Sequence, residues 1–177
     1  KTFEVRVDGK RQSGVTAKDI ILSIIGEIGT AGATGYVIEY TGQAISSLSM
    51  EQRMTICNMS IEGGARAGMI SPDQTTINYL KERPRIKNLE NLELLIDEWK
   101  NLASDKGSEF DKKIILNADN MAPQVSWGTS PGMVSGIDSK VPNPKDIEDS
   151  VKRKSTEDAL NYMGLKPNTN IEDIKID

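Results

Sequence analysis

The sequence predicts an α/β fold, because segments with strand periodicity alternate with segments that have helix periodicity. At the start of the chain, apolar Phe3, Val5 and Val7 alternate with polar residues, which is typical of a strand with one buried face. A helix pattern follows over 17–28, with Thr16 placed as its N-cap. We expect short, mainly parallel or mixed strands, because helices separate most of them.

Capping residues predict most of the helix boundaries. Ser49 and Gln52 form a capping-box motif, so a helix should open at Met50. The Ser-Pro-Asp run at 71–73 predicts another helix start, with the proline near the first helical position. Ser155 is placed as the cap of the last helix, and Gly164 as its left-handed stop.

These signals place each element in turn. The expected elements are a strand over 2–7, a helix over 17–28, a strand over 36–40, a helical turn over 43–48, a helix over 50–63, a strand over 68–70, a helix from 71–73 to 80, a polar connector over 81–88, an amphipathic helix over 89–103, strands over 110–116 and 122–127, a loop over 128–149, and a helix over 155–163. In domain terms, residues 1–128 form the predicted core, 129–150 a loop-rich connector, and 151–177 a helix and a lead-in to a following domain.

Composition excludes several classes of function. The chain has 177 residues, a net charge of −4 and a pI of about 5.1, so it lacks the basic balance of a nucleic-acid-binding protein. It has no histidine and one cysteine, which excludes an internal disulfide and a metal site built from several of its own cysteines. The apolar run 20–25 is too short to span a bilayer, and no signal peptide is visible. We therefore expect a cytoplasmic protein without nucleic-acid or membrane partners and without a metal ligand set of its own.

Asn58 and Glu62 are candidate site residues, because they stand four apart at the end of a predicted helix, followed by two glycines. In one interpretation they present an amide and a carboxylate to the same bound group. In the other, Glu62 is a helix-end residue in water and the glycines only stop the helix.

Two other features have structural and functional interpretations. Cys57 stands among apolar neighbours, which favours packing over reactivity. The stretch SWGTSPG (126–132) follows a predicted strand, so it either lines a cleft or serves as an ordinary connection. The basic run at 151–154 indicates a solvated helix approach, since it is too small to indicate nucleic acid.

Four stretches together resemble the large subunits of 3-isopropylmalate dehydratases, in the aconitase family. They are GVTAKDIILSIIGEIGTAGATGYVIEYTGQAISSLSMEQRMT, RMTICNMSIEGGARAGMISPDQTT, MAPQVSWGTSPG and ALNYMGLKP. The resemblance extends over essentially the whole chain. It departs from the family at Tyr36, Gln74 and Ser130, where histidine, glutamate and asparagine are usual, and the last of these leaves the role of the loop open.

The resemblance implies a three-layer α/β/α aconitase-type domain and a role for the two candidate residues. Family enzymes hold a [4Fe–4S] cluster by three cysteines, and the fourth iron acts on the substrate hydroxyl. By resemblance, Asn58 hydrogen-bonds near a cluster sulfide, and Glu62 is catalytic, acting on the oxygen that leaves the substrate. The resemblance does not place Cys57 among the ligands.

The resemblance also implies the wider function. The chain is expected to be an internal fragment of a hydro-lyase that interconverts 2-isopropylmalate and 3-isopropylmalate in leucine biosynthesis, paired with a small subunit that supplies a catalytic serine. The fragment alone is expected to bind no cluster and to be inactive. The alternatives are a homoaconitase or methylmalate-type dehydratase, which differ in substrate, and a standalone binding module without chemistry.

Overall fold

The computed structural model describes residues 1–176 and confirms the α/β class. A four-stranded sheet in the order β3-β2-β1-β4 lies at the centre, and all of its strand pairs are parallel. Its strands are β1 (Thr2–Asp8), β2 (Val37–Thr41), β3 (Ala67–Met69) and β4 (Lys112–Asn117). Because β1 pairs with both β2 and β4, it is a central strand of this sheet.

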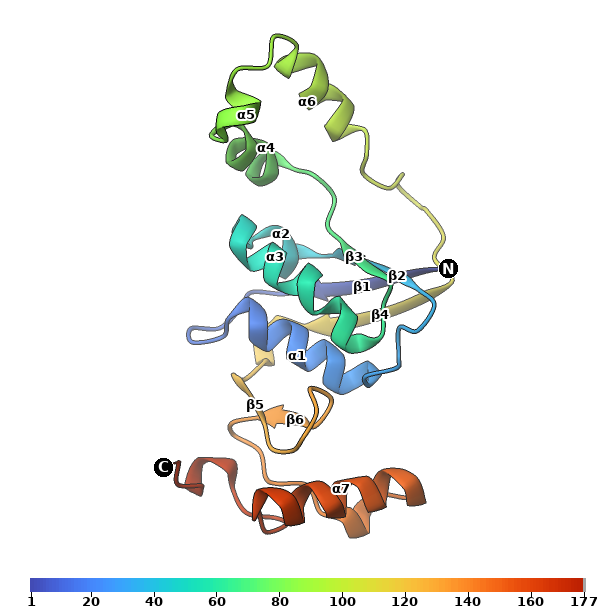
Figure 1. Cartoon of the computed structure of the whole chain (residues 1–177), viewed down its shortest axis with the longest axis vertical. Coiled ribbons are helices and arrows are strands. Elements are labelled where there is room, and N and C mark those ends of the chain that lie inside the picture. Colours follow the sequence, from blue (N-terminus) through green and yellow to red (C-terminus); the bar gives the residue numbers. More distant parts are fainter. Residues whose placement is uncertain (177) are drawn as a thin grey trace.

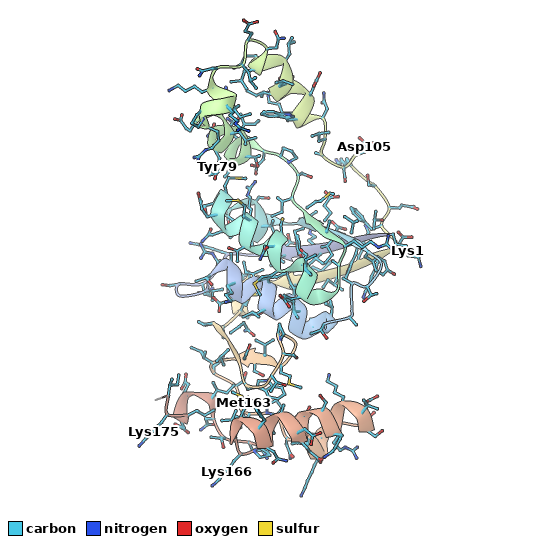
Figure 2. The ribbon with its side chains drawn as sticks, in the orientation of Figure 1. Lys1, Tyr79, Asp105, Met163, Lys166 and Lys175 are labelled. Carbon is cyan, nitrogen blue, oxygen red and sulfur yellow. The ribbon has the colours of Figure 1, made fainter. Side chains whose placement is uncertain are left out.

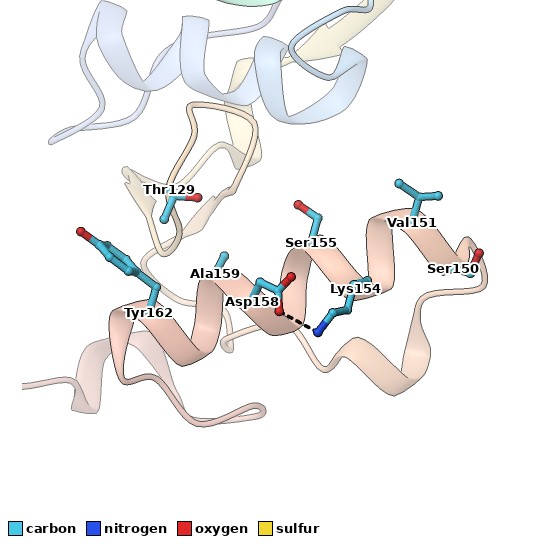
Figure 3. A pocket seen from close by; sticks show the side chains of 8 residues that line it. All are labelled: Thr129, Ser150, Val151, Lys154, Ser155, Asp158, Ala159 and Tyr162. Carbon is cyan, nitrogen blue, oxygen red and sulfur yellow. Dashed lines mark hydrogen bonds and ion pairs between the residues drawn. The ribbon is translucent and has the colours of Figure 1, made fainter.

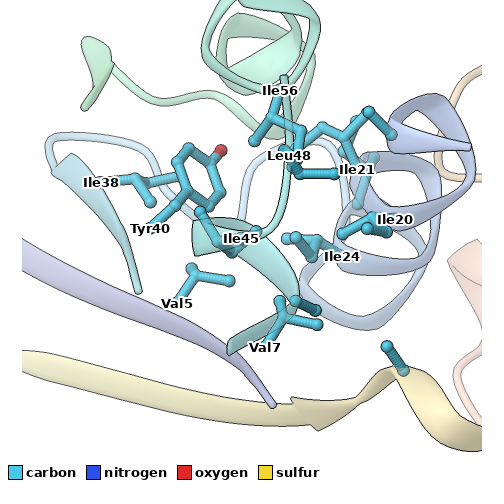
Figure 4. Close-up of a cluster of buried hydrophobic side chains, with 14 of the residues drawn as sticks. Val5, Val7, Ile20, Ile21, Ile24, Ile38, Tyr40, Ile45, Leu48 and Ile56 are labelled. Carbon is cyan, nitrogen blue, oxygen red and sulfur yellow. The ribbon is translucent and has the colours of Figure 1, made fainter. Parts of the chain in front are cut away.

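Helices α1 (Ala17–Ile28), α2 (Gln43–Ser46) and α3 (Met50–Met59) bury one face of this sheet. The inward residues of β1 and β2 meet the apolar sides of these helices in one continuous core (Figure 4). The residues of the two strands that point away from these helices, such as Glu4 and Glu39, form a polar face. The connector 101–111 passes beside this face, and the Ser104 hydroxyl donates to the Glu39 carboxylate at 2.6 Å. The alternation predicted for 2–7 is therefore confirmed, because one face is buried and the other is polar.

Capping explains where α1 and α3 begin. Thr16 and Asp19 form a capping box at the start of α1, and Ser49 and Gln52 form the predicted one at the start of α3. The helix expected over 50–63 ends earlier, at Met59. Its last part tightens into the 3₁₀ helix η1 (Ser60–Gly63).

The segment from 74 to 100 forms an arm that rises from the central body (Figures 1 and 2). It contains α4 (Gln74–Lys81), α5 (Pro84–Lys87) and α6 (Leu92–Lys100). Asp73 caps α4, so Pro72 precedes the cap, and the prediction that it stands near the first helical position was wrong. The polar connector expected over 81–88 contains the short helix α5, which begins at Pro84. The amphipathic helix expected over 89–103 is shorter than predicted, and Leu102 lies beyond the end of α6 and is 68% exposed.

A hairpin and a long helix lie on the opposite side of α1 from the sheet (Figure 1). Strands β5 (Gln124–Ser126) and β6 (Val134–Gly136) are antiparallel, and they follow the 3₁₀ helix η2 (Ala118–Asn120). Beyond them come η3 (Pro144–Asp146), α7 (Ser150–Met163) and η4 (Ile171–Asp173). The loop expected over 128–149 thus contains β6 and η3.

The N-cap of helix α7 lies six residues earlier than expected. Asp149, not Ser155, caps it by accepting from the Lys152 N–H at 2.7 Å, while Gly164 ends it in the left-handed conformation as predicted. Trp127, at the end of β5, packs with Ala159 and Leu160 of α7 in a second apolar cluster. The predicted lead-in over 164–177 includes Asp177, which lies outside the described residues. Among residues 1–176, no helix has both the length and the apolar character needed to cross a membrane.

Candidate functional site

Glu62 lies on η1, where the chain turns from α3 towards β3, and its side chain is exposed. Ser60 anchors this turn to the core. Its buried hydroxyl lies 2.7 Å from the Tyr40 hydroxyl and donates to the Ile56 carbonyl at 3.2 Å. Burial raises the pKa of Tyr40 to about 12, so the phenol stays protonated and keeps this bond. Gly64 ends η1 at φ +84°, where a Cβ would approach the Thr30 carbonyl to 2.9 Å. The backbone therefore requires glycine at position 64 for steric reasons that do not depend on Glu62. Glu62 itself is exposed on this fixed turn.

Glu62 borders a hollow of about 370 Å³, which we call the Glu62 hollow. Helix α1 lines one side through Lys18 and Leu22, which stand one turn apart. The end of β5 and the loop that follows it line the other side, through residues that include Ser126 and Ser130. The structure therefore brings together two features that the sequence analysis selected separately: the residue Glu62 and the loop 126–132.

The loop is held in place from both of its strands. The Gln124 N–H donates to the Asp19 carboxylate at 2.7 Å, which ties β5 to the first turn of α1. On the other strand, Val134 packs so closely against Gly26 of α1 that a Cβ there would lie 2.8 Å from its Cγ1 atom. Within the loop, the Met133 N–H donates to the Ser130 carbonyl at 3.0 Å. The far wall of the hollow is thus attached to the same helix that forms its near wall.

Asp19 is a buried acid that remains ionised. Burial by itself raises the pKa of its carboxyl, but the hydrogen bonds from the Gln124 N–H and from the Thr16 hydroxyl and N–H outweigh it, so the pKa lies below its ordinary value. Its negative charge is engaged by groups of this chain, in the capping box of α1 and in the hydrogen bond from the Gln124 N–H of β5.

Asn58 and Cys57 lie outside this hollow. Asn58 is exposed on the last turn of α3 and does not line the Glu62 hollow, so the two candidate residues do not share this feature. Cys57 packs against the main core, as the packing interpretation predicted, and burial raises the pKa of its thiol. A raised pKa disfavours the reactive thiolate at neutral pH.

Sequence reasoning missed Lys18, the one lysine that lines the hollow. Its signal was available, because Lys18 is a cation in the first turn of a helix, where the helix dipole disfavours positive charge. Chemically, the hollow combines a carboxylate that can exchange protons, an ammonium group and serine hydroxyls. This combination suits an anionic substrate that carries a hydroxyl group.

A second hollow, of about 710 Å³, lies along α7 on the other side of the same loop (Figure 3). Thr129 borders both hollows. Tyr162 and an ion pair between Lys154 and Asp158, with 2.8 Å between Nζ and Oδ1, contribute to the α7 side. The ion pair is solvent-exposed, so it adds little to stability.

The donors for an iron–sulfur cluster of the kind implied by the sequence resemblance are not present in this chain. Such a cluster takes several thiolates, whereas the chain has the single, half-buried Cys57. Across residues 1–176, no three His, Cys, Asp or Glu side chains gather closely enough to hold a metal ion. The residues present therefore do not fit the cluster as its ligands.

Comparison with protein families gives one match over the whole chain. The model of the aconitase family (aconitate hydratase) matches residues 1–177. The parallel sheet with its helices is consistent with the three-layer α/β/α domain expected for that family. Members of the family are hydro-lyases and generally use a [4Fe–4S] cluster. On this match, together with the fold, the chain belongs to the aconitase family.

Proposed function

We propose that this chain is part of a hydro-lyase that interconverts 2-isopropylmalate and 3-isopropylmalate in leucine biosynthesis. The observation that carries the proposal is the exposed Glu62, which lines one hollow together with residues 126–131 in a chain of the aconitase family. The choice of isopropylmalate rests on the resemblance of the stretches 14–76, 121–132 and 159–167. The enzyme would act in the cytoplasm, together with a small subunit.

Glu62 would move the proton that the hydroxyl group needs. In dehydration, a hydroxyl leaves one carbon as water, so the leaving oxygen takes a proton that a carboxylic acid can donate. In rehydration, the carboxylate takes that proton back from the water that adds. Because Glu62 is exposed on a fixed turn, its carboxyl can also exchange protons with solvent between turnovers. The proton on the neighbouring carbon would be removed by a serine of the small subunit.

The cluster would be held by cysteines that this chain does not contain. The exposed Asn58 amide at the end of α3 is available to a neighbouring domain, and we propose that it hydrogen-bonds beside that cluster. No further step in the reaction is assigned to Asn58.

The test is a substrate comparison with the complete enzyme that contains this chain. We would measure kcat/KM for 2-isopropylmalate, homocitrate and 2-methylmalate, which differ in the substituent beside the hydroxyl. We expect 2-isopropylmalate to exceed the others by at least about 10-fold, since burial of a small apolar group discriminates by roughly 10- to 200-fold. A preference for homocitrate or 2-methylmalate would assign the chain to a different dehydratase. Turnover of none of the three would overturn the hydro-lyase proposal.

A further inference from the structure

We propose that Lys18 binds a carboxylate of the substrate and so orients the substrate hydroxyl towards Glu62. This inference rests on the proposed function for the chemistry at Glu62, but the binding of an anion at Lys18 can be tested without turnover. The ligand class is a small hydroxy acid with at least two carboxylates.

The ammonium group of Lys18 is the free positive charge on this side of α1. Lys18 is exposed, and within residues 1–176 it forms no ion pair, whereas six other basic residues do. The helix end beside it is already occupied, because Thr16 and Asp19 satisfy each other in the capping box. An incoming anion would therefore be recognised by the lysine side chain and not by the amides of the helix end.

Helix stability and packing do not account for a lysine at this position. A cation in the first turn of a helix opposes the helix dipole, so it destabilises the helix slightly. Since Lys18 is exposed, it also buries little apolar surface. Leu22, one turn further on, is buried and forms the floor beneath it. Placement beside the Glu62 hollow is the remaining role that the structure offers for the charge.

The opposite charges of Lys18 and Glu62 border one hollow without forming an ion pair. A molecule between them can place a carboxylate on the ammonium and a hydroxyl at the carboxylate. In the described part of the chain, the side-chain hydroxyls of Ser126 and Ser130 make no hydrogen bond, so both can donate to the same anion. Because the loop is attached to α1 through Asp19 and Gly26, the spacing between these donors and Lys18 is set before a ligand binds.

The first experiment measures binding by the 177-residue chain, without turnover. The chain, labelled with ¹⁵N, is titrated with 2-isopropylmalate dianion, and its dimethyl ester serves as the uncharged control. We expect amide shifts in the first turn of α1 and in the loop 126–131, and none with the ester. Lys18→Met should raise the Kd by roughly 10- to 100-fold, which is the effect expected from losing one charge-assisted hydrogen bond. Lys18→Arg should restore much of the affinity, because it keeps the charge.

Lys106→Met is the matched control, since it removes the same charge from an exposed lysine in the connector and leaves the hollow intact. It should leave the Kd unchanged. The proposal is overturned if the wild-type chain shows no shifts in the hollow, or if Lys18→Met and Lys106→Met bind alike. Thermal melts of all variants should coincide, because the substituted side chains are exposed.

The second experiment uses the complete enzyme and separates this proposal from the proposed function. Lys18→Met should raise KM for 2-isopropylmalate by roughly 10-fold or more and change kcat much less. If the enzyme turns over 2-isopropylmalate and Lys18→Met leaves KM unchanged, the role of Lys18 is wrong and the function stands. If the enzyme turns over no 2-isopropylmalate although the chain binds it through Lys18, the function is wrong and the binding site stands.

Discussion

Arg53 is the least exposed charged residue among residues 1–176, with 3% of its side chain accessible. Its guanidinium binds both carboxylate oxygens of Asp73, at 2.7 and 2.6 Å, and donates to the carbonyls of Ser46 and Leu48. These hydrogen bonds from Arg53 hold the pKa of the Asp73 carboxyl below its ordinary value. The pair links α3 to the N-cap of α4, so it fixes the point at which the arm leaves the body.

The two partners of this pair should differ in what their loss costs. Asp73→Asn leaves a buried guanidinium without its counter-charge, which we expect to lower the free energy of unfolding by about 3 kcal/mol. Arg53→Met removes the buried charge and leaves a carboxylate that is 40% exposed and can be hydrated, so we expect a smaller loss of about 1–2 kcal/mol. Urea unfolding of both variants at neutral pH measures the difference. The interpretation is wrong if Arg53→Met is the more damaging change.

At the scale of elements, α1 connects the core to the candidate site. Its inner side, with Ile20, Ile21 and Ile24, packs against the sheet. Its outer side presents Lys18, Leu22 and Gly26 at intervals of four residues, so that all three face the hairpin or the hollow. Helix α1 thus packs in the core on one side and positions the walls of the Glu62 hollow on the other.

The hairpin approaches α1 closely at Gly26, and a double-mutant cycle can test this contact. Alanine is ordinarily a better helix former than glycine by about 1 kcal/mol. Here Gly26→Ala should instead destabilise the chain by about 1 kcal/mol, because the new methyl group overlaps Val134. In a Val134→Ala background the same change should stabilise by about 0.5–1 kcal/mol. Equal effects in the two backgrounds would show that the contact does not limit the approach.

Local signals made some elements predictable and left others hidden. The capping boxes at Thr16 and Ser49 act within a few residues of chain, so α1 and α3 began where expected. Helix α7 was misplaced because Asp149 and Ser155 are both good caps, and contacts with the preceding loop hold the earlier start, where Arg153 donates to the carbonyls of Ile147 and Glu148. Strand β6 was missed because a three-residue strand has too little pattern of its own, and its pairing with β5 defines it.

In the whole molecule, the Glu62 hollow is lined by three parts of the chain: the outer side of α1, the turn after α3 and the hairpin loop. Glu62 and the loop 126–132 could each be selected from the sequence, but their proximity depends on how the hairpin folds back onto α1. Lys18 was missed because an exposed helix lysine is ordinary, and its unfavourable place in the first turn of α1 gains meaning only beside the assembled hollow. The expected partnership between Asn58 and Glu62 assumed a continuous helix, whereas η1 intervenes.

The whole chain also sets a limit on cofactor binding. With one thiol, it should not assemble a stable cubane when it is treated with iron and sulfide under anaerobic conditions. The measurement is a visible spectrum with an iron determination after desalting. A broad cluster absorption with stoichiometric iron would contradict the view that the ligands lie elsewhere. The same treatment of the complete enzyme should give the full cluster.

The measurement that tests the central claim most directly is turnover per intact cluster of the Glu62→Gln variant in the complete enzyme. Glutamine keeps the size of the side chain but cannot exchange a proton, so we expect a rate loss of about 10²- to 10⁴-fold. Glu109→Gln, an exposed acid away from the hollow, should leave the rate unchanged. Melts of both variants should stay within about 0.5 kcal/mol of the wild type, since both acids are exposed. The account is contradicted if Glu62→Gln lowers stability by several kcal/mol while turnover per cluster is unchanged, because the carboxylate would then be structural.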